Sequence, residues 1–168
     1  MTSSALPGLS RLNASDAPTA AGLLHEVCAS AAWGAAVAAG RPYADAESLY
    51  AASDAATAAL TPADLDEAMA GHPPIGRPKA GDATSSREQA GMAGASDALK
   101  AEMLELNLRY QDRFGHVFLI CATGLSGEQM LAAVKERIGN TPERERETVR
   151  EQLGRINRIR LRRLAEGE

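Results

Sequence analysis

Apolar residues recur along most of this chain at the three- and four-residue spacing of an amphipathic helix. The clearest run places four side chains on one helical face: Leu99, Met103, Leu106 and Tyr110. The segment 17–40 is small and apolar, and Gly40 and Pro42 end it, so it predicts a core helix or a pair of helices. The pattern indicates a protein built mainly from packed helices.

Capping residues mark where several of these helices begin. Asp45 stands before an amphipathic segment that runs to Leu60, and Thr61 precedes a proline that suits a first helical position. Ser126 and Gln129 have the spacing of a capping box, in which each side chain bonds the backbone N–H of the other. We therefore expect helices to start at these three places.

Two segments interrupt the helical pattern. Residues 71–86 hold three prolines and three glycines, and because a helix cannot run through Pro73 and Pro74, a loop is expected there. Residues 114–122 form a short apolar run with β-branched members, which is typical of either a strand or a buried connector.

Composition and length agree with a helical protein of modest size. Alanine, the strongest helix former, makes up 34 of the 168 residues. The length suits one domain with one core, because two separate domains of half this length would each have only marginal stability. We predict an all-α fold, a single compact domain over residues 1–168 with roughly seven to nine helices.

Charge and cysteine usage narrow the classes of function. No stretch approaches the roughly 18 to 20 apolar residues that span a bilayer. We therefore expect no membrane contact. Cys28 and Cys121 are too far apart in sequence for a CxxC pair and do not match a zinc site, so we expect a protein of the reducing cytoplasm. The one basic cluster, residues 155–163, is interpreted as a solvated helix face and not as a nucleic-acid surface, because the chain has six aromatic residues and a net charge of -4.

The proline-rich segment holds the best acid/base candidate of the chain. His72 follows a predicted helix end and precedes two prolines, which leave its backbone few states. An imidazole with an ordinary pKa near 6.5 gives or takes a proton at neutral pH. The alternative is a histidine that only helps to close the helix end.

A polar cluster at residues 85–92 admits two interpretations. Ser85 and Ser86 before an acidic residue indicate a helix start, with a hydroxyl capping free N–H groups. The same N–H donors, flanked by hydroxyl, carboxylate and amide side chains, suit a polar heterocycle or a carboxylate. The sequence contains no phosphate-binding glycine loop, no GxSxG elbow and no HExxH pattern, so no metal site is expected.

Several ordered motifs together resemble the 2-oxo-4-hydroxy-4-carboxy-5-ureidoimidazoline (OHCU) decarboxylase family. They are GHPPIGR at 71–77, SSREQAGM at 85–92, LNLRYQDRFGHVFLICATG at 106–124 and INRIRLRRL at 156–164. Upstream, Trp33 followed by Arg41, Pro42 and Tyr43 is also similar to the family. The resemblance covers about residues 9–165, nearly the whole chain.

The resemblance implies an all-α lyase of urate breakdown that uses no cofactor and produces (S)-allantoin and CO2. It assigns catalysis to His72 and Glu88, with His72 as the acid/base. It also implies a substrate site made from two segments: Pro73, Ser85, Ser86, Arg87 and Gln89 in the first, and Phe118, Leu119, Ile120, Cys121 and Ala122 in the second. The partners it implies are a small ureidoimidazoline substrate and a second copy of the chain in a homodimer.

One departure from the family leaves an alternative function open. Ala122 and Thr123 stand where many members carry an arginine after the apolar run, so the group that binds the substrate carboxylate is expected among Arg77, Arg87 and Arg113. If that arginine loss abolished turnover, the chain would be a non-catalytic helical binding or interaction module derived from the family.

Overall fold

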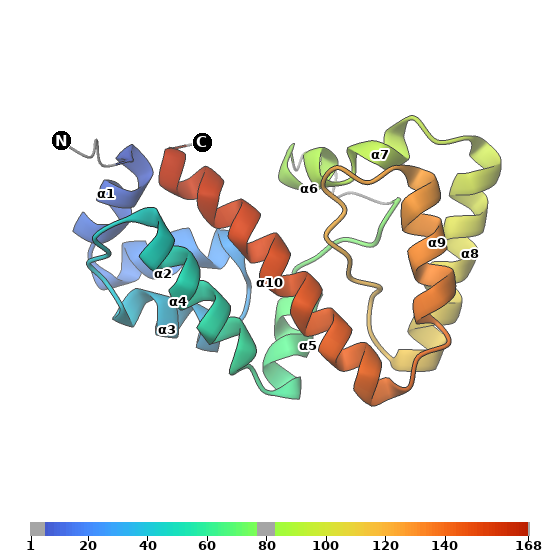
Figure 1. The fold of residues 1–168 in the computed structure, drawn as a ribbon, viewed down its shortest axis with the longest axis horizontal. Helices are drawn as coiled ribbons and strands as arrows, with labels where there is room; N and C mark the ends of the chain where they lie inside the picture. Colours follow the sequence, from blue (N-terminus) through green and yellow to red (C-terminus); the bar gives the residue numbers. More distant parts are fainter. Residues whose placement is uncertain (1–5, 77–82, 168) are drawn as a thin grey trace. The chain divides into compact units, whose positions relative to one another are not determined.

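A computed structural model describes residues 6–76 and 83–167, with side chains for all of these except 83–85. The helices in this part of the chain are α1 (Pro7–Ala14), α2 (Ala17–Val27), α3 (Ala31–Ala39), α4 (Ala46–Ala58), α5 (Pro62–Ala70), α6 (Ala83–Glu88), α7 (Ala90–Ala93), α8 (Asp97–Phe114), α9 (Gly127–Arg137) and α10 (Pro142–Glu166) (Figure 1). No strand occurs among the described residues. The prediction of an all-α fold is confirmed.

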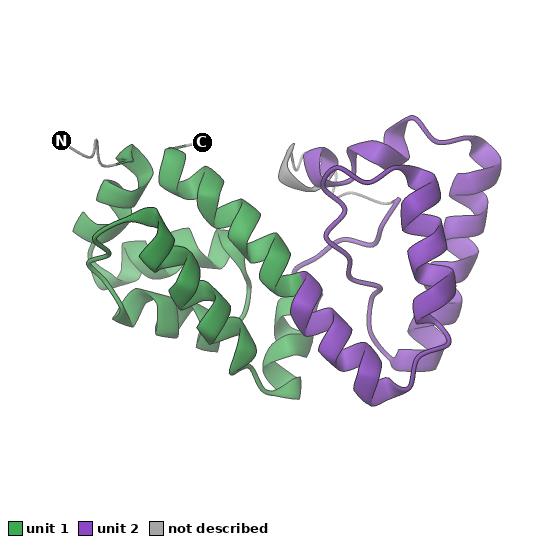
Figure 2. Cartoon of the chain, in the orientation of Figure 1, with its two compact units in different colours: residues 1–68, 153–168 green, residues 69–152 purple. Residues whose placement is uncertain are grey.

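The chain forms two compact units (Figure 2). Unit 1 consists of Met1–Ala68 and Leu153–Glu168, and unit 2 consists of Met69–Gln152. The long helix α10 therefore contributes its first part to unit 2 and its second part to unit 1.

Unit 1 packs α1 against α2, α2 against α3 and α3 against α4 around a buried apolar core. Trp33 and Val37 of α3 are fully buried in it. Asn13 of α1 holds the backbone of Tyr43, because its Nδ2 donates to the Tyr43 carbonyl at 2.9 Å and its Oδ1 accepts from the Tyr43 N–H at 2.9 Å. A side-chain amide thus fixes the connection between α3 and α4.

The predicted helix starts are confirmed by their cap hydrogen bonds. The Asp45 carboxylate accepts from the Ser48 N–H at 2.8 Å, which holds the pKa of that carboxyl below its usual range. Thr61 Oγ1 accepts from the Asp64 N–H at 3.2 Å at the start of α5. Ser126 and Gln129 form a full capping box at α9. These caps depend only on neighbours in sequence, which is why the sequence predicts them.

The structure corrects one predicted helix start and distinguishes between the two interpretations of the apolar run at 114–122. Helix α6 begins at Ala83, so Ser85 and Ser86 lie inside its first turn and not before it. The run from Val117 to Ala122 is an irregular connector and not a strand, because no neighbouring strand is present in the described part of unit 2 to pair with it.

The core of unit 2 contains side chains from five separate stretches of sequence, namely the loop after α5, α7, α8, the connector at 117–122 and α9. Helix α8 packs against α9, with Met103 and Tyr110 fully buried on the predicted apolar face. The Tyr110 ring lies edge-on to Phe118 of the connector, with ring centroids 5.3 Å apart.

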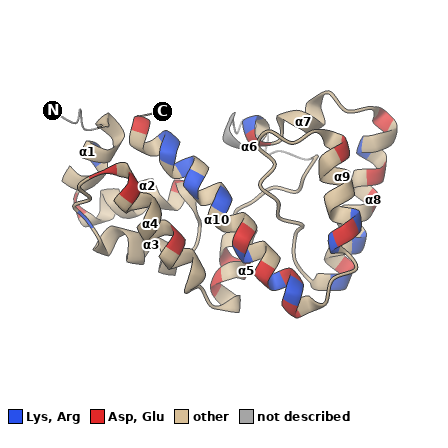
Figure 3. Ribbon diagram, viewed as in Figure 1, with Lys and Arg blue, Asp and Glu red and all other residues tan. Residues whose placement is uncertain are grey.

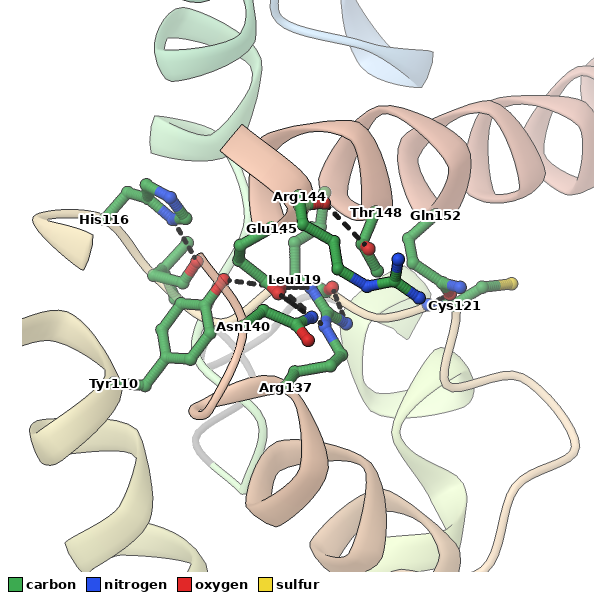
Figure 4. Close-up of polar contacts among 11 residues, drawn as sticks. Tyr110, His116, Leu119, Cys121, Arg137, Asn140, Arg144, Glu145, Thr148 and Gln152 are labelled. Atoms are coloured by element: carbon green, nitrogen blue, oxygen red, sulfur yellow. Dashed lines mark hydrogen bonds and ion pairs between the residues drawn. The ribbon is translucent and has the colours of Figure 1, made fainter. Parts of the chain in front are cut away.

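A buried ion pair lies within this core. The Arg137 guanidinium at the end of α9 donates from Nε to Glu145 Oε1 of α10 at 2.6 Å, and Glu145 is completely buried (Figure 4). The Tyr110 hydroxyl donates to the same carboxylate oxygen at 2.9 Å. Burial, aided by the Glu145 carboxylate, holds the pKa of Tyr110 well above its usual value, so the phenol remains a donor.

Basic residues gather along the second part of α10 (Figure 3), and two of them form contacts within unit 1. Arg158 lies 3.2 Å from the Asp54 carboxylate and over the Tyr50 ring, and Arg160 donates to the Val27 carbonyl at 2.9 Å. These contacts support the interpretation of a structural helix face. No described helix is long and apolar enough to cross a membrane.

We expect Arg137→Met to lower the free energy of unfolding by about 3–5 kcal/mol, because it leaves the buried Glu145 carboxylate without its cation. Arg109→Met is the matched control, since Arg109 forms an exposed pair with Glu105 and should change stability by no more than about 0.5 kcal/mol. Urea unfolding of both variants measures the difference, and equal effects would contradict the ion pair's importance.

The close approach of α1 to the end of α10 gives a second stability prediction. A Cβ on Gly8 would lie 1.6 Å from the Leu164 carbonyl oxygen, so Gly8→Ala should destabilise the protein by about 1–3 kcal/mol. A Cβ on Gly22 meets nothing within 4 Å, and Gly22→Ala should stabilise α2 by about 0.5–1 kcal/mol. Thermal unfolding should therefore shift in opposite directions for the two variants.

Candidate functional site

The loop that follows α5 carries His72 just past the helix end. The His72 backbone N–H donates to the Met69 carbonyl at 3.0 Å, so the residue closes the last turn of α5 within unit 2. Its side chain is half-buried, as are Pro73 and Pro74. The His72 backbone therefore closes the helix end, as the alternative interpretation predicts, and Pro73 and Pro74 leave the chain that follows it few backbone states.

Gln89, predicted as a substrate ligand, bonds to this loop. Its side chain is 6% exposed. Oε1 accepts from the Gly76 N–H at 2.8 Å, and Nε2 donates to the Pro74 carbonyl at 3.1 Å. The SSREQAGM motif is thereby tied to the GHPPIGR motif by side-chain to backbone hydrogen bonds.

The other residues of the 85–92 motif differ in exposure. Glu88 is half-buried, whereas Ser86 and Arg87 are exposed, and the side chain of Ser85 lies outside the described residues. Gly91 is in close contact with the connector after Ala122, because a Cβ there would lie 1.9 Å from the Leu125 carbonyl oxygen. Only glycine allows this approach of the two backbones.

The predicted second wall, residues 118–122, has its backbone held by helices α9 and α10. Arg137 Nη1 donates to the Leu119 carbonyl at 2.7 Å, with its guanidinium 4.5 Å from the Phe118 ring centroid. The Cys121 N–H donates to Gln152 Oε1 at 2.9 Å (Figure 4). The Cys121 N–H would thus reach a ligand only by releasing Gln152.

One hydrophobic cluster joins the three predicted site segments. It contains Ile75 from the His72 loop, Met92 from the 85–92 motif, and Phe118 and Ala122 from the connector. Segments up to 47 positions apart in the sequence therefore meet in the core of unit 2. The structure brings together the segments that the sequence analysis selects, although their individual ligand roles stay predictions.

Three side chains outside the predicted site residues hold these segments. Asn107, Arg137 and Gln152 each bond to the backbone of the His72 loop or the connector. The sequence indicates a special role for Asn107, because it is a polar residue on the apolar face of α8 between Met103 and Tyr110. Arg137 and Gln152 lie in charged, polar stretches where nothing indicated their partners.

Three arginines were expected as candidates to bind the substrate carboxylate, and they differ in position. Arg113 donates to the Asn140 carbonyl at 2.7 Å, and its guanidinium lies over the Phe114 ring. Arg87 is exposed at the end of α6, and Arg77 lies outside the described residues. The same Phe114 ring is stacked with the His116 ring.

Comparisons with known proteins agree with the motifs. The model of the OHCU decarboxylase family matches residues 13–162. The 2-oxo-4-hydroxy-4-carboxy-5-ureidoimidazoline decarboxylase of Amia calva is 33% identical over 141 residues, which cover 80% of this chain and 78% of that protein. The uric acid degradation bifunctional protein TTL of Arabidopsis thaliana is 31% identical over 130 residues, or 73% of this chain and 40% of that protein.

Solved structures show the same relationship. A crystal structure of OHCU decarboxylase in the presence of (S)-allantoin superposes with a TM-score of 0.73 at 30% identity, covering 83% of this chain and 94% of that one. A structure of (S)-allantoin synthase gives a TM-score of 0.72 at 21% identity, covering 93% and 53%, and shows the shared fold. With its motifs, its helical fold and these matches in agreement, the chain belongs to the OHCU decarboxylase family.

Proposed function

We propose that this chain decarboxylates 2-oxo-4-hydroxy-4-carboxy-5-ureidoimidazoline to (S)-allantoin and CO2, with His72 as the acid/base. Membership of the family makes the chain a carboxy-lyase of urate degradation that acts on a small molecule. The observation that supports the site is the convergence in unit 2 of the His72 loop, the 85–92 motif and the 118–122 connector.

The substrate itself accepts the electrons released by decarboxylation. Breaking the bond between the ring carbon and its carboxylate leaves an electron pair that forms a carbon–carbon double bond with the neighbouring imine carbon. The imine nitrogen then takes up a proton. A second proton adds to the former imine carbon while the hydroxyl loses its own, which gives the carbonyl and the stereocentre of allantoin. The enzyme must therefore orient the substrate and move protons.

His72 is suited to these proton transfers. Its ring takes the hydroxyl proton in this proposal and delivers a proton to one face of the carbon that becomes the stereocentre. Glu88 would bind the N–H groups of the ring or ureido substituent, or pair with His72 to keep the imidazole protonated. One-sided delivery is what distinguishes the enzymatic product from the racemic product of spontaneous decay.

The remaining predicted residues would recognise the substrate's polar groups. Ser85, Ser86 and Arg87 lie at the start of this motif, and the 118–122 connector would supply backbone hydrogen bonds that reject analogues lacking those groups. Gln89 supports the site at least by holding the His72 loop, and its contact with the ureido group stays a prediction.

Two further parts of the proposal concern assembly and location. The resemblance to the family supports a homodimer, and the lack of any paired-cysteine motif supports a reducing cytoplasm. Sedimentation of the purified protein tests the first, because a monomer at micromolar concentration would contradict it. Cell fractionation tests the second.

We expect His72→Asn to reduce the rate of (S)-allantoin formation by at least about 100-fold, because general acid/base groups contribute about 10²–10⁴ to the rate. The substrate is generated in situ from urate with the two preceding enzymes, and circular dichroism follows the chiral product. His25→Asn is the matched control, since His25 is exposed on α2 in unit 1 and should keep the wild-type rate.

Two outcomes would contradict the proposal at different levels. A wild-type chain that gives no excess of the S isomer over spontaneous decay would support the non-catalytic binding module. A fully active His72→Asn variant with an undiminished S excess would retain the lyase and remove His72 from its mechanism.

A further inference from the structure

The backbone of the His72 loop depends on side chains for its hydrogen bonds. Pro73 and Pro74 have no N–H group, so neither residue can donate a backbone hydrogen bond within the loop. Buried or half-buried backbone groups nevertheless need partners. Gln89 bonds two of them, the Gly76 N–H and the Pro74 carbonyl.

The carbonyl of Ile75, between these two groups, is bonded from a different element. Asn107 of α8 donates from Nδ2 to it at 2.9 Å. The side chain of Ile75 is 5% exposed and lies in the hydrophobic cluster of unit 2. Ile75 is therefore held through its side chain by the core and through its carbonyl by Asn107, three positions after His72.

For the stability of the fold alone, an apolar side chain would be more favourable than Asn107 at this position. Asn107 is 4% exposed on the apolar face of α8, and its Oδ1 is buried without a hydrogen-bond partner among the described residues. A buried amide with half of its bonding capacity unmet costs stability relative to an apolar side chain of similar size. Among the described residues, the hydrogen bond of its side chain is to the loop that carries His72.

We propose that Asn107 is a positioning residue of the decarboxylase, which places the His72 ring by holding the Ile75 carbonyl. Asn107 acts through the loop and does not touch the substrate. This inference rests on the proposed role of His72. It predicts that removing the amide impairs turnover without a matching loss of stability.

The test compares two replacements that remove the donor but pack differently. Asn107→Leu fills the site with apolar volume, and Asn107→Ser leaves it partly empty. Both should lower kcat by about tenfold or more, with KM changed less than about twofold, because displacement of a reacting group acts mainly on the chemical step. The thermal midpoint should stay near the wild-type value in Asn107→Leu and fall in Asn107→Ser.

Asn13→Leu is the matched control. Asn13 is also a side-chain amide that bonds the backbone of a loop, but it lies in unit 1 and holds Tyr43. This variant loses two hydrogen bonds, so its thermal midpoint should fall while kcat stays within about twofold of wild type. Opposite patterns in Asn107→Leu and Asn13→Leu would separate positioning from general stability.

A second readout does not depend on turnover. The protein has three histidines, and the NMR signals of the His72 ring are assigned by their loss in His72→Asn. Asn107→Leu should shift the His72 ring signals and leave those of His25 unchanged. Unmoved His72 signals together with a kcat within about twofold of wild type would overturn the proposal. If the wild-type chain shows no decarboxylation, the proposed function fails, and the ring signals still test the positioning.

Discussion

The structure of the candidate site depends on one requirement: buried backbone N–H and C=O groups in irregular segments must find partners. Helices satisfy their own backbone, but the His72 loop and the connector at 117–122 do not. Four polar side chains bond backbone groups of these two segments: Gln89, which lies between α6 and α7, and Asn107, Arg137 and Gln152 of α8, α9 and α10. The helical framework thus sets the position of two segments that have no regular structure of their own.

The buried ion pair between Arg137 and Glu145 helps to hold the connector. A charged pair in a core is a poor source of net stability, because removing both charges from water costs about as much as their attraction returns. Arg137, however, has several donors, and it uses them for Glu145 and for the Leu119 carbonyl. The Glu145 carboxylate holds the guanidinium in the orientation that bonds the connector, and the Tyr110 hydroxyl bonds that same carboxylate.

How far the sequence predicts this structure depends on the range of each interaction. The caps at Asp45, Thr61 and Ser126 involve residues three positions apart, so their patterns predict them correctly. The start of α6 at Ala83 was missed, because serines suit both a cap and a first turn. The side chains that hold the site segments were missed for a different reason. Gln152 bonds a residue 31 positions away, and no local pattern in its helix reveals that partner.

The family motifs select three segments that meet in the core of unit 2, and the structure shows what some of their residues do. Gln89 was expected to face a ligand, and its amide holds the loop that carries the acid/base candidate. Gly91 was part of a motif without an assigned role, and it permits the contact with the Leu125 backbone. A motif residue can therefore be required for the shape of a site as well as for contact with the substrate.

The bond between Gly76 and Gln89 gives this loop a natural spectroscopic reporter. The prolines at 73 and 74 carry no amide hydrogen, whereas the Gly76 N–H is donated to Gln89 Oε1 at 2.8 Å. Exchange of that single amide hydrogen with deuterated solvent requires the bond to open. Its protection factor therefore measures the free energy of opening the bond that joins the His72 loop to Gln89, in the absence of substrate and without any mutation.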